Sequence, residues 1–153
     1  MRMNLVVMAS AAALTLATAA AAAPNIRAVM HERHEGMETI GKAFKSLRRE
    51  FDASSPNPAT VRASANQIAN LAMRSSGWFP RGSGPEAGKT GAKPEIWRNW
   101  NDFVAKDKAF QQSARLFQAA AASGNMNVAK ARFGELGQTC KACHDKYRSD
   151  MHH

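Results

Sequence analysis

Cysteine is scarce in this chain of 153 residues, which contains only Cys140 and Cys143. Because the two lie three residues apart, they cannot form the long-range disulfides that hold many small secreted proteins together. Acidic residues are also in the minority, with 12 Asp and Glu against 21 Lys and Arg, so the formal net charge is +9. The basic residues are scattered rather than clustered, which argues against a nucleic-acid site and favours a solvated surface that prefers acidic partners.

Long hydrophobic runs are lacking except near the N-terminus. Residues 1–22 combine an early Arg2, an apolar run over residues 5–16 and a series of alanines that matches the A-x-A cleavage pattern of a secretory signal peptide. The apolar run is shorter than the roughly 20 residues that a membrane-spanning helix needs. We therefore expect cleavage after Ala22, export of a mature domain of residues 23–153 without a membrane span, and no nucleic-acid partner.

No segment shows the alternation of polar and apolar residues that predicts a β-strand, whereas apolar residues recur at helical spacing through most of the chain. The first such segment covers residues 25–51. Asn57 and Pro58 are a typical N-cap and first helical residue for a second helix. Two further helices are expected over residues 94–124 and 126–148. The sequence therefore predicts an all-α fold, an antiparallel four-helix bundle.

One long connection interrupts this helical pattern. Residues 75–93 contain five glycines and two prolines, which are too many for a regular element. We expect Trp78 and Phe79 to anchor this connection on the core. Within the third helix, Asp107 interrupts an otherwise apolar stripe.

The two cysteines belong to the pattern C-x-x-C-H, completed by His144, which is the attachment signature of c-type haem. On a helix, Cys140 and Cys143 lie on one face, so both thiols can bond to the two vinyl-derived carbons of one porphyrin. His144 follows as the expected axial ligand of the iron through a neutral imidazole. Gly134 and Gly137 precede the motif, and their lack of side chains would let the macrocycle or a neighbouring helix approach closely.

Three other kinds of site share parts of this pattern: a thioredoxin-like dithiol, a zinc site and a local disulfide. The dithiol needs a βαβ context with the motif at the start of a helix, whereas here the motif ends a helical chain. Zinc prefers four ligands, and beyond Cys140, Cys143 and His144 only His152 and His153 are near in the sequence. Export, helicity and the trailing histidine together favour haem c.

The first helix offers residues for the remaining contacts of a haem. Arg33 is the single charged residue on an apolar stripe, so a buried acidic partner such as a haem propionate would explain it, unless the side chain reaches solvent at the bundle edge. Met37, one turn later, is either a core residue or the sixth ligand of the iron. Arg148 lies one turn beyond His144 and either adds positive potential near the iron or contacts solvent.

Several of these segments together carry a family resemblance. The sequence resembles the class II c-type cytochromes, that is, the cytochrome c′ family including its low-spin, methionine-ligated branch. The matching segments are residues 137–148 (GQTCKACHDKYR), residues 94–97 (PEIW), the Trp78, Phe79 and Pro80 segment of the connection, and Arg33 with Met37 and Phe44 on the first helix.

This resemblance implies an antiparallel four-helix bundle with one covalent haem c and its iron, often a homodimer, in the periplasm of a Gram-negative bacterium. In one branch an apolar side chain covers a five-coordinate iron that binds nitric oxide or carbon monoxide. In the other branch a methionine ligates the iron and the protein carries electrons. Residues 33–41 look more like the second branch, so the resemblance implies Met37 and His144 as iron ligands, with Arg33 and Arg148 beside the cofactor.

We therefore expect an electron carrier that exchanges single electrons with redox partner proteins, rather than an enzyme. The sequence pairs no nucleophile with a base, and no acid-base group falls on the haem-facing stripe of the first helix. The alternative is a five-coordinate protein that binds nitric oxide or carbon monoxide. A dithiol protein without haem is a third possibility, and it would lack visible colour.

Overall fold

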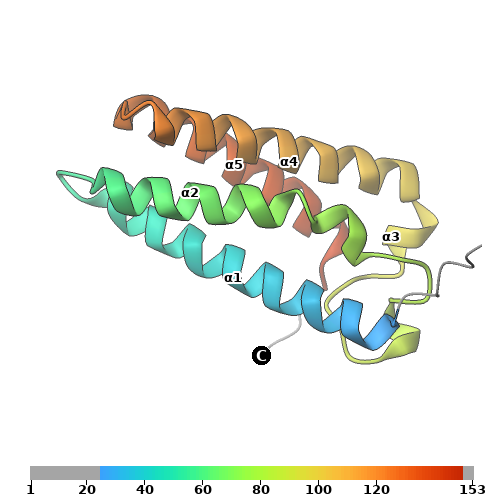
Figure 1. Cartoon of the computed structure of the whole chain (residues 1–153). Helices are drawn as coiled ribbons and strands as arrows, with labels where there is room; N and C mark the ends of the chain where they lie inside the picture. Colours follow the sequence, from blue (N-terminus) through green and yellow to red (C-terminus); the bar gives the residue numbers. More distant parts are fainter. Residues whose placement is uncertain (1–24, 150–153) are drawn as a thin grey trace, which may run out of the picture.

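The computed structural model describes residues 25–149 and is a bundle of four long helices (Figure 1). The expected signal peptide, residues 1–22, and both C-terminal histidines lie outside the described residues. Within residues 25–149 there is no β-strand, and no helix is long and apolar enough to cross a membrane. The predicted all-α fold is therefore confirmed. The long helices are α1 (Ile26–Asp52), α2 (Pro58–Ala72), α4 (Trp100–Ala122) and α5 (Met126–Tyr147).

The starts of three long helices are set by asparagine caps. The side chain of Asn25 accepts a hydrogen bond from the backbone of α1, and Asn125 does the same for α5. Asn57 caps α2, and Pro58 occupies its first turn, as the sequence predicts. Gly124 follows the end of α4 with a φ of +80°, a conformation that glycine adopts without strain. Local sequence thus determines these boundaries.

The predicted third helix is wrong in one respect, because it is two helices rather than one. A short helix α3 (Glu95–Arg98) is separated from α4 by Asn99, whose φ of −116° and ψ of 45° are not helical. The side-chain amide of Asn99 donates a hydrogen bond to the carbonyl of Glu95 at 3.2 Å. Asparagine side chains readily form such local hydrogen bonds with backbone carbonyls, which favours a break in the helix at this position.

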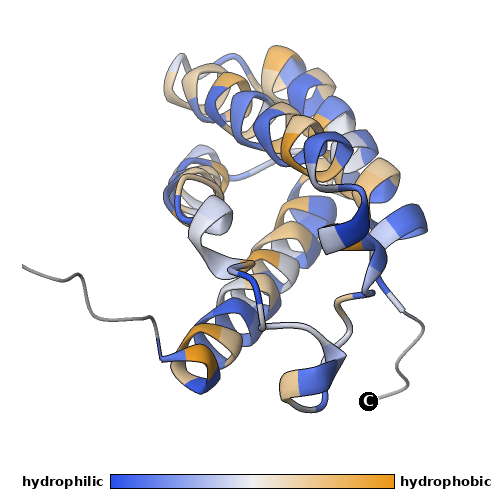
Figure 2. Cartoon of the chain, turned by 90° about the vertical axis from the view of Figure 1, so that its right-hand side faces the viewer, coloured by the Kyte–Doolittle hydropathy of each residue, from blue (hydrophilic) through white to orange (hydrophobic). Residues whose placement is uncertain are grey.

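The core runs the length of the bundle between the four long helices. Figure 2 shows hydrophobic and hydrophilic stretches alternating around each of them, as expected for amphipathic helices. Small residues of α2 and α4, such as Ala65 and Ala114, are fully buried and let these two helices pack closely. The largest side chains without solvent exposure include Leu47, Val61, Ile68, Phe117 and Leu136.

The connection between α2 and α3 folds over one end of the bundle and contains two short 3₁₀ helices, η1 (Ser75–Trp78) and η2 (Pro85–Ala87). Trp78 and Phe79 are buried in the core, so the prediction that they anchor this segment is confirmed. The indole ring of Trp78 lies directly against Gly36 of α1, where even a methyl group would overlap it. The connection is therefore a packed part of the fold.

Asp107 interrupts the apolar stripe of α4 in the sequence, yet its side chain is buried. Its carboxylate accepts hydrogen bonds from the hydroxyl of Ser75 and, at 2.7 Å, from the amide of Gln111. Burial raises the pKa of Asp107, and these two neutral donors only partly offset the shift. The core therefore contains one carboxyl group without a charged partner among its hydrogen-bond donors.

Candidate haem-binding site

The two cysteines lie on α5 and face the interior only in part. Both are partly buried, and their side chains pack against the hydrophobic core. Burial raises the pKa of Cys140, and burial together with the carboxylate of Asp107 raises the pKa of Cys143 to about 11. Both side chains are therefore neutral thiols at neutral pH, whereas redox dithiols need a stabilised thiolate. These surroundings argue against the dithiol alternative.

His144 is half-buried, one residue beyond Cys143. Burial lowers the pKa of His144, and the positive charge of Arg148 lowers it further. The imidazole is therefore held in the neutral form, which is the form that ligates a metal. This is the electrostatic environment expected for an axial ligand of iron.

A zinc site at the same residues is not supported. In the part of the chain that the structure describes, one group of His, Cys, Asp or Glu residues has all its ligand atoms within 4.8 Å of one another, and it is His34, Glu35 and Glu38 on the exposed face of α1. Cys140, Cys143 and His144 form no such cluster, so they do not converge on one small ion. Their spread along one helix suits a larger cofactor that bonds to each at a different point.

The residues of α1 that face α5 can be located from the register of these two antiparallel helices (Figure 1). The ammonium group of Lys130 donates a hydrogen bond to the carbonyl of Phe51 at 2.7 Å. The ring of Phe44 lies against Gly137, where an added Cβ would be 3.1 Å from its Cζ atom. Both contacts define the same register, because seven residues separate Phe44 from Phe51 and Lys130 from Gly137.

Extending this register by two turns brings Met37 and His144 to the same level of the bundle. Met37 lies seven residues before Phe44, and His144 lies seven residues after Gly137. Since both helices rise about 1.5 Å per residue, the two positions stay level as the helices continue. Met37 is partly buried and packs against the core. A thioether on one helix thus lies at the level of the imidazole on the other.

The same register places Arg33 level with Arg148, one turn further along. Arg33 is only 5% exposed, so the alternative that it reaches solvent is wrong. One terminal nitrogen donates to the carbonyl of Trp78 and to the hydroxyl of Ser83, both at 3.1 Å. The other donates to the carbonyl of Ser83 at 2.8 Å and to the hydroxyl of Thr90 at 2.9 Å.

These contacts hold Arg33 in place within the protein, and its expected contact with a haem propionate stays a prediction. Four neutral oxygen atoms of the connection, rather than a carboxylate, accept hydrogen bonds from its terminal nitrogens. The guanidinium also lies over the ring of Phe79, 5.0 Å from the ring centroid. Arg33 therefore ties the connection to α1 beside the haem-bearing residues. Sequence reasoning missed Ser83 and Thr90, because a glycine-rich segment without periodicity gives no signal of such contacts.

Arg148 ends α5, and its side chain is exposed. The backbone around it pairs with the connection, because Lys93 donates to the carbonyl of Tyr147 at 3.0 Å and Ser149 donates to that of Gly91 at 2.9 Å. Arg148 also forms an isolated antiparallel bridge with Ala92. The connection is thus attached to α1 through Arg33 and to the end of α5 through its backbone, and it closes the end of the bundle that carries the motif.

These residues fit a covalently attached haem. The two thiols share one face of α5, and a neutral histidine follows them directly. A thioether lies at the level of that histidine on the neighbouring helix. Of the two glycines before the motif, Gly137 allows a close helix approach, because it lies against Phe44. At Gly134 an added Cβ would have no neighbour within 4 Å.

Comparisons with known proteins agree with this assignment. The sequence model of the family described as cytochrome c′ matches residues 28–148. The chain is 38% identical over 117 residues to cytochrome c′ from Alcaligenes xylosoxydans xylosoxydans, covering 76% of this chain and 89% of the relative. It is 32% identical over 153 residues to cytochrome c′ from Rhodospirillum rubrum, covering 96% and 99% of the two chains.

Solved structures give the same result. Cytochrome c′ from Thermochromatium tepidum superposes with a TM-score of 0.77 at 31% identity, over 84% of this chain and 100% of that one. A cytochrome c′ described as having a ligand-controlled dimer dissociation matches with a TM-score of 0.77 at 29% identity, over the same shares. A nitric oxide complex of a mutant cytochrome c′ from Alcaligenes xylosoxidans matches with a TM-score of 0.74 at 27% identity, over 82% and 97%. The chain belongs to the cytochrome c′ family and binds covalently attached haem c with its iron.

Proposed function

We propose that this protein transfers single electrons through one haem c that is bonded to Cys140 and Cys143, with His144 and Met37 as the axial ligands of the iron. The observation that carries the proposal is the register of α1 and α5, which brings Met37 level with His144. A haem iron with histidine and methionine ligands is the arrangement of electron-transfer cytochromes. Six-coordinate iron changes its geometry little between oxidation states, which favours fast electron exchange.

The surroundings of Met37 support an electron carrier rather than an enzyme. The next residues on the same stripe of α1 are Ile40 and Phe44, and neither can donate or accept a proton. Arg33, on the other side, is held by four hydrogen bonds to the connection. A substrate at this face would thus meet a thioether, apolar groups and a fixed cation.

The proposal includes a location and partners. We place the mature protein, residues 23–153, in the periplasm, because residues 1–22 have the pattern of a signal peptide. The excess of Lys and Arg over Asp and Glu favours acidic redox proteins as partners. We further propose that the protein forms a homodimer, since dimer dissociation is named for a related cytochrome c′.

The substitution Met37→Ala tests the proposal. We expect the wild-type ferric protein to be low-spin at neutral pH, with a weak sulfur-to-iron charge-transfer band in the near infrared. In Met37→Ala the iron loses its sixth ligand, so the ferric spectrum becomes high-spin and the near-infrared band disappears. Electronic absorption and electron paramagnetic resonance of the purified protein measure both changes.

Met30→Ala is the matched control. Met30 lies two turns before Met37 on α1, and its methyl group lies 3.9 Å from where a Cβ on Gly88 would be. Its removal should leave the spin state and the near-infrared band unchanged. A wild-type ferric spectrum that is already wholly high-spin would refute methionine ligation.

The second candidate function is the binding of nitric oxide or carbon monoxide by a five-coordinate iron. It is favoured by the similarity to the cytochrome c′ whose mutant forms a nitric oxide complex. It is also compatible with a Met37 side chain that packs against the core. In that case Met37→Ala speeds ligand entry to an iron that is already high-spin, so the experiment above separates the two functions.

A further inference from the structure

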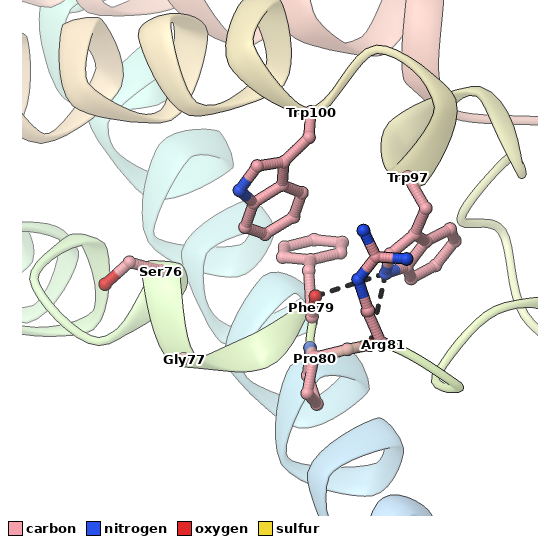
Figure 3. Close-up of a pocket in the computed structure, with 7 residues that line it drawn as sticks. All are labelled: Ser76, Gly77, Phe79, Pro80, Arg81, Trp97 and Trp100. Carbon is pink, nitrogen blue, oxygen red and sulfur yellow. Dashed lines mark hydrogen bonds between the residues drawn. The ribbon is translucent and has the colours of Figure 1, made fainter.

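A pocket of about 320 Å³ lies where η1 and the residues after it meet α3 and the start of α4 (Figure 3). Its walls include the aromatic rings of Phe79, Trp97 and Trp100, and Arg81 lines it as well. This volume is in the range of small-molecule sites. We propose that the pocket binds a planar aromatic anion and that, when this ligand is a hydroquinone, the pocket is an electron-entry site; the electron-transfer part rests on the proposed function.

The aromatic walls are held in place by other parts of the fold. The indole nitrogen of Trp97 donates to the carbonyls of Phe79 and Pro80, at 3.2 and 3.1 Å. The ring of Phe79 packs edge-on against Phe103, with 4.7 Å between the ring centroids. Trp100 stacks on Phe103 at 5.6 Å and remains 41% exposed. A flat ring can therefore stack on preformed aromatic surfaces, which favours planar ligands.

The charge of the ligand follows from Arg81. Its side chain is exposed, and in the described part of the chain no hydrogen bond or ion pair engages its guanidinium. The arginines before and after it in the sequence are already paired with carboxylates. Arg74 pairs with Glu32, and Arg98 pairs with Glu95 at 3.3 Å. Arg81 can thus bind a carboxylate or sulfonate through two parallel hydrogen bonds.

Ring contacts connect this pocket to the haem-bearing helix. Trp100 stacks on Phe103, and Phe103 packs edge-on against Tyr147 with 5.4 Å between the ring centroids. Tyr147 lies on α5 three residues after His144. A bound hydroquinone loses one electron, which reduces ferric to ferrous iron, and releases one proton to solvent. The resulting semiquinone leaves, and two semiquinones disproportionate in solution to hydroquinone and quinone.

The test uses the ferric holoprotein, with naphthohydroquinone sulfonate as the probe, in stopped-flow experiments that follow haem reduction. We expect the observed rate to saturate as the probe concentration rises. Arg81→Gln should raise the half-saturating concentration about tenfold, the factor that corresponds to one lost charged contact. Arg81→Lys should recover part of it, because lysine keeps the charge but not the planar fork. Naphthohydroquinone without the sulfonate should not respond to Arg81→Gln.

Trp100 gives a second, independent variant. Trp100→Ala should weaken probe binding and lower the limiting rate, and Trp100→Phe should restore most of both because it keeps an aromatic ring at this wall. Arg115→Gln and Leu116→Ala change exposed residues of α4 away from the pocket, so they are matched controls and should behave as the wild type.

Two results would overturn the inference. One is a rate that rises linearly with probe concentration, and the other is a half-saturating concentration that is the same in Arg81→Gln and Arg115→Gln. Hexaammineruthenium(II), a cationic reductant that Arg81 would repel, tests the proposed function separately. If it reduces the haem and the haem reoxidises reversibly while the probe shows either overturning result, only the pocket is refuted. If the haem does not cycle with either reagent, electron transfer itself is refuted.

Discussion

Replacing Arg33 by methionine should destabilise the fold by about 3–5 kcal/mol. Methionine keeps an unbranched apolar stem but removes the four hydrogen bonds that the terminal nitrogens donate to Trp78, Ser83 and Thr90. Each hydrogen bond from a charged donor contributes roughly 1.5–3 kcal/mol, and the acceptors left unpaired in a buried region are costly. Burial lowers the pKa of Arg33, which reflects a desolvation cost, and relief of this cost in the variant offsets part of the loss.

Urea unfolding of the holoprotein, followed by far-UV circular dichroism, measures this loss. Because a typical domain has a total stability of about 5–15 kcal/mol, the change should move the midpoint substantially. Arg115→Met is the control, since Arg115 is exposed on α4, and its effect should stay within about 0.5 kcal/mol. Amide exchange should accelerate in the connection of Arg33→Met more than in α2. A loss below about 1 kcal/mol would show that these hydrogen bonds do not stabilise the fold.

Two further substitutions test the packing of the core. Gly36→Ala should lower the free energy of unfolding by about 1–3 kcal/mol, because its methyl group would overlap the ring of Trp78. Gly41→Ala on the same helix meets no neighbour and should raise the free energy of unfolding by up to about 1 kcal/mol. Thermal or urea unfolding measures both changes, and equal effects would refute the overlap. Asp107→Asn should stabilise the protein at neutral pH. Since the folded pKa of Asp107 is raised, the folded state binds its proton more tightly, so wild-type stability falls as pH rises from the ordinary pKa of an aspartate through the folded pKa. The advantage of Asp107→Asn should therefore shrink as pH falls from neutrality toward about 4. Asp52→Asn, at an exposed position, is the control for loss of a negative charge. A gain from Asp107→Asn that is independent of pH would contradict this reasoning.

Local signals in the sequence predict most of the helices correctly. Asn57 and Pro58 mark the start of α2, and Gly124 marks the end of α4, because these residues act through their own backbone conformation and side-chain hydrogen bonds. The break at Asn99 was not predictable from periodicity, since the apolar stripe continues from α3 into α4 across it. At Asn99 the side-chain amide joins the backbone N–H in donating to the carbonyl of Glu95, and the backbone leaves the helical conformation there.

Contacts across long stretches of sequence are the part that the sequence did not reveal. The sequence already marks Arg33 as the single charged residue on the apolar stripe of α1. Its partners Ser83 and Thr90, however, are 50 and 57 residues away, in a segment whose glycines give no periodic pattern. Asp107 reads as a defect in an apolar stripe, yet it is a buried acceptor for the hydroxyl of Ser75. A buried polar group is stabilised by its hydrogen-bond partners, and those partners become neighbours only when the chain has folded.

The position of Met37 relative to His144 depends on the same kind of information. The haem motif identifies His144, and helical spacing identifies the stripe that contains Met37, but neither pattern states which turn of α1 lies beside which turn of α5. The register follows from the packing of Phe44 on Gly137 and from the hydrogen bond between Lys130 and Phe51, two contacts that indicate the same pairing of turns. A shift of one turn would bring either Arg33 or Gly41 to the level of His144 instead. Under the proposed ligation by Met37, the bare position at Gly137 matters to the iron two turns away, because it sets which turn of α1 lies level with His144 of α5.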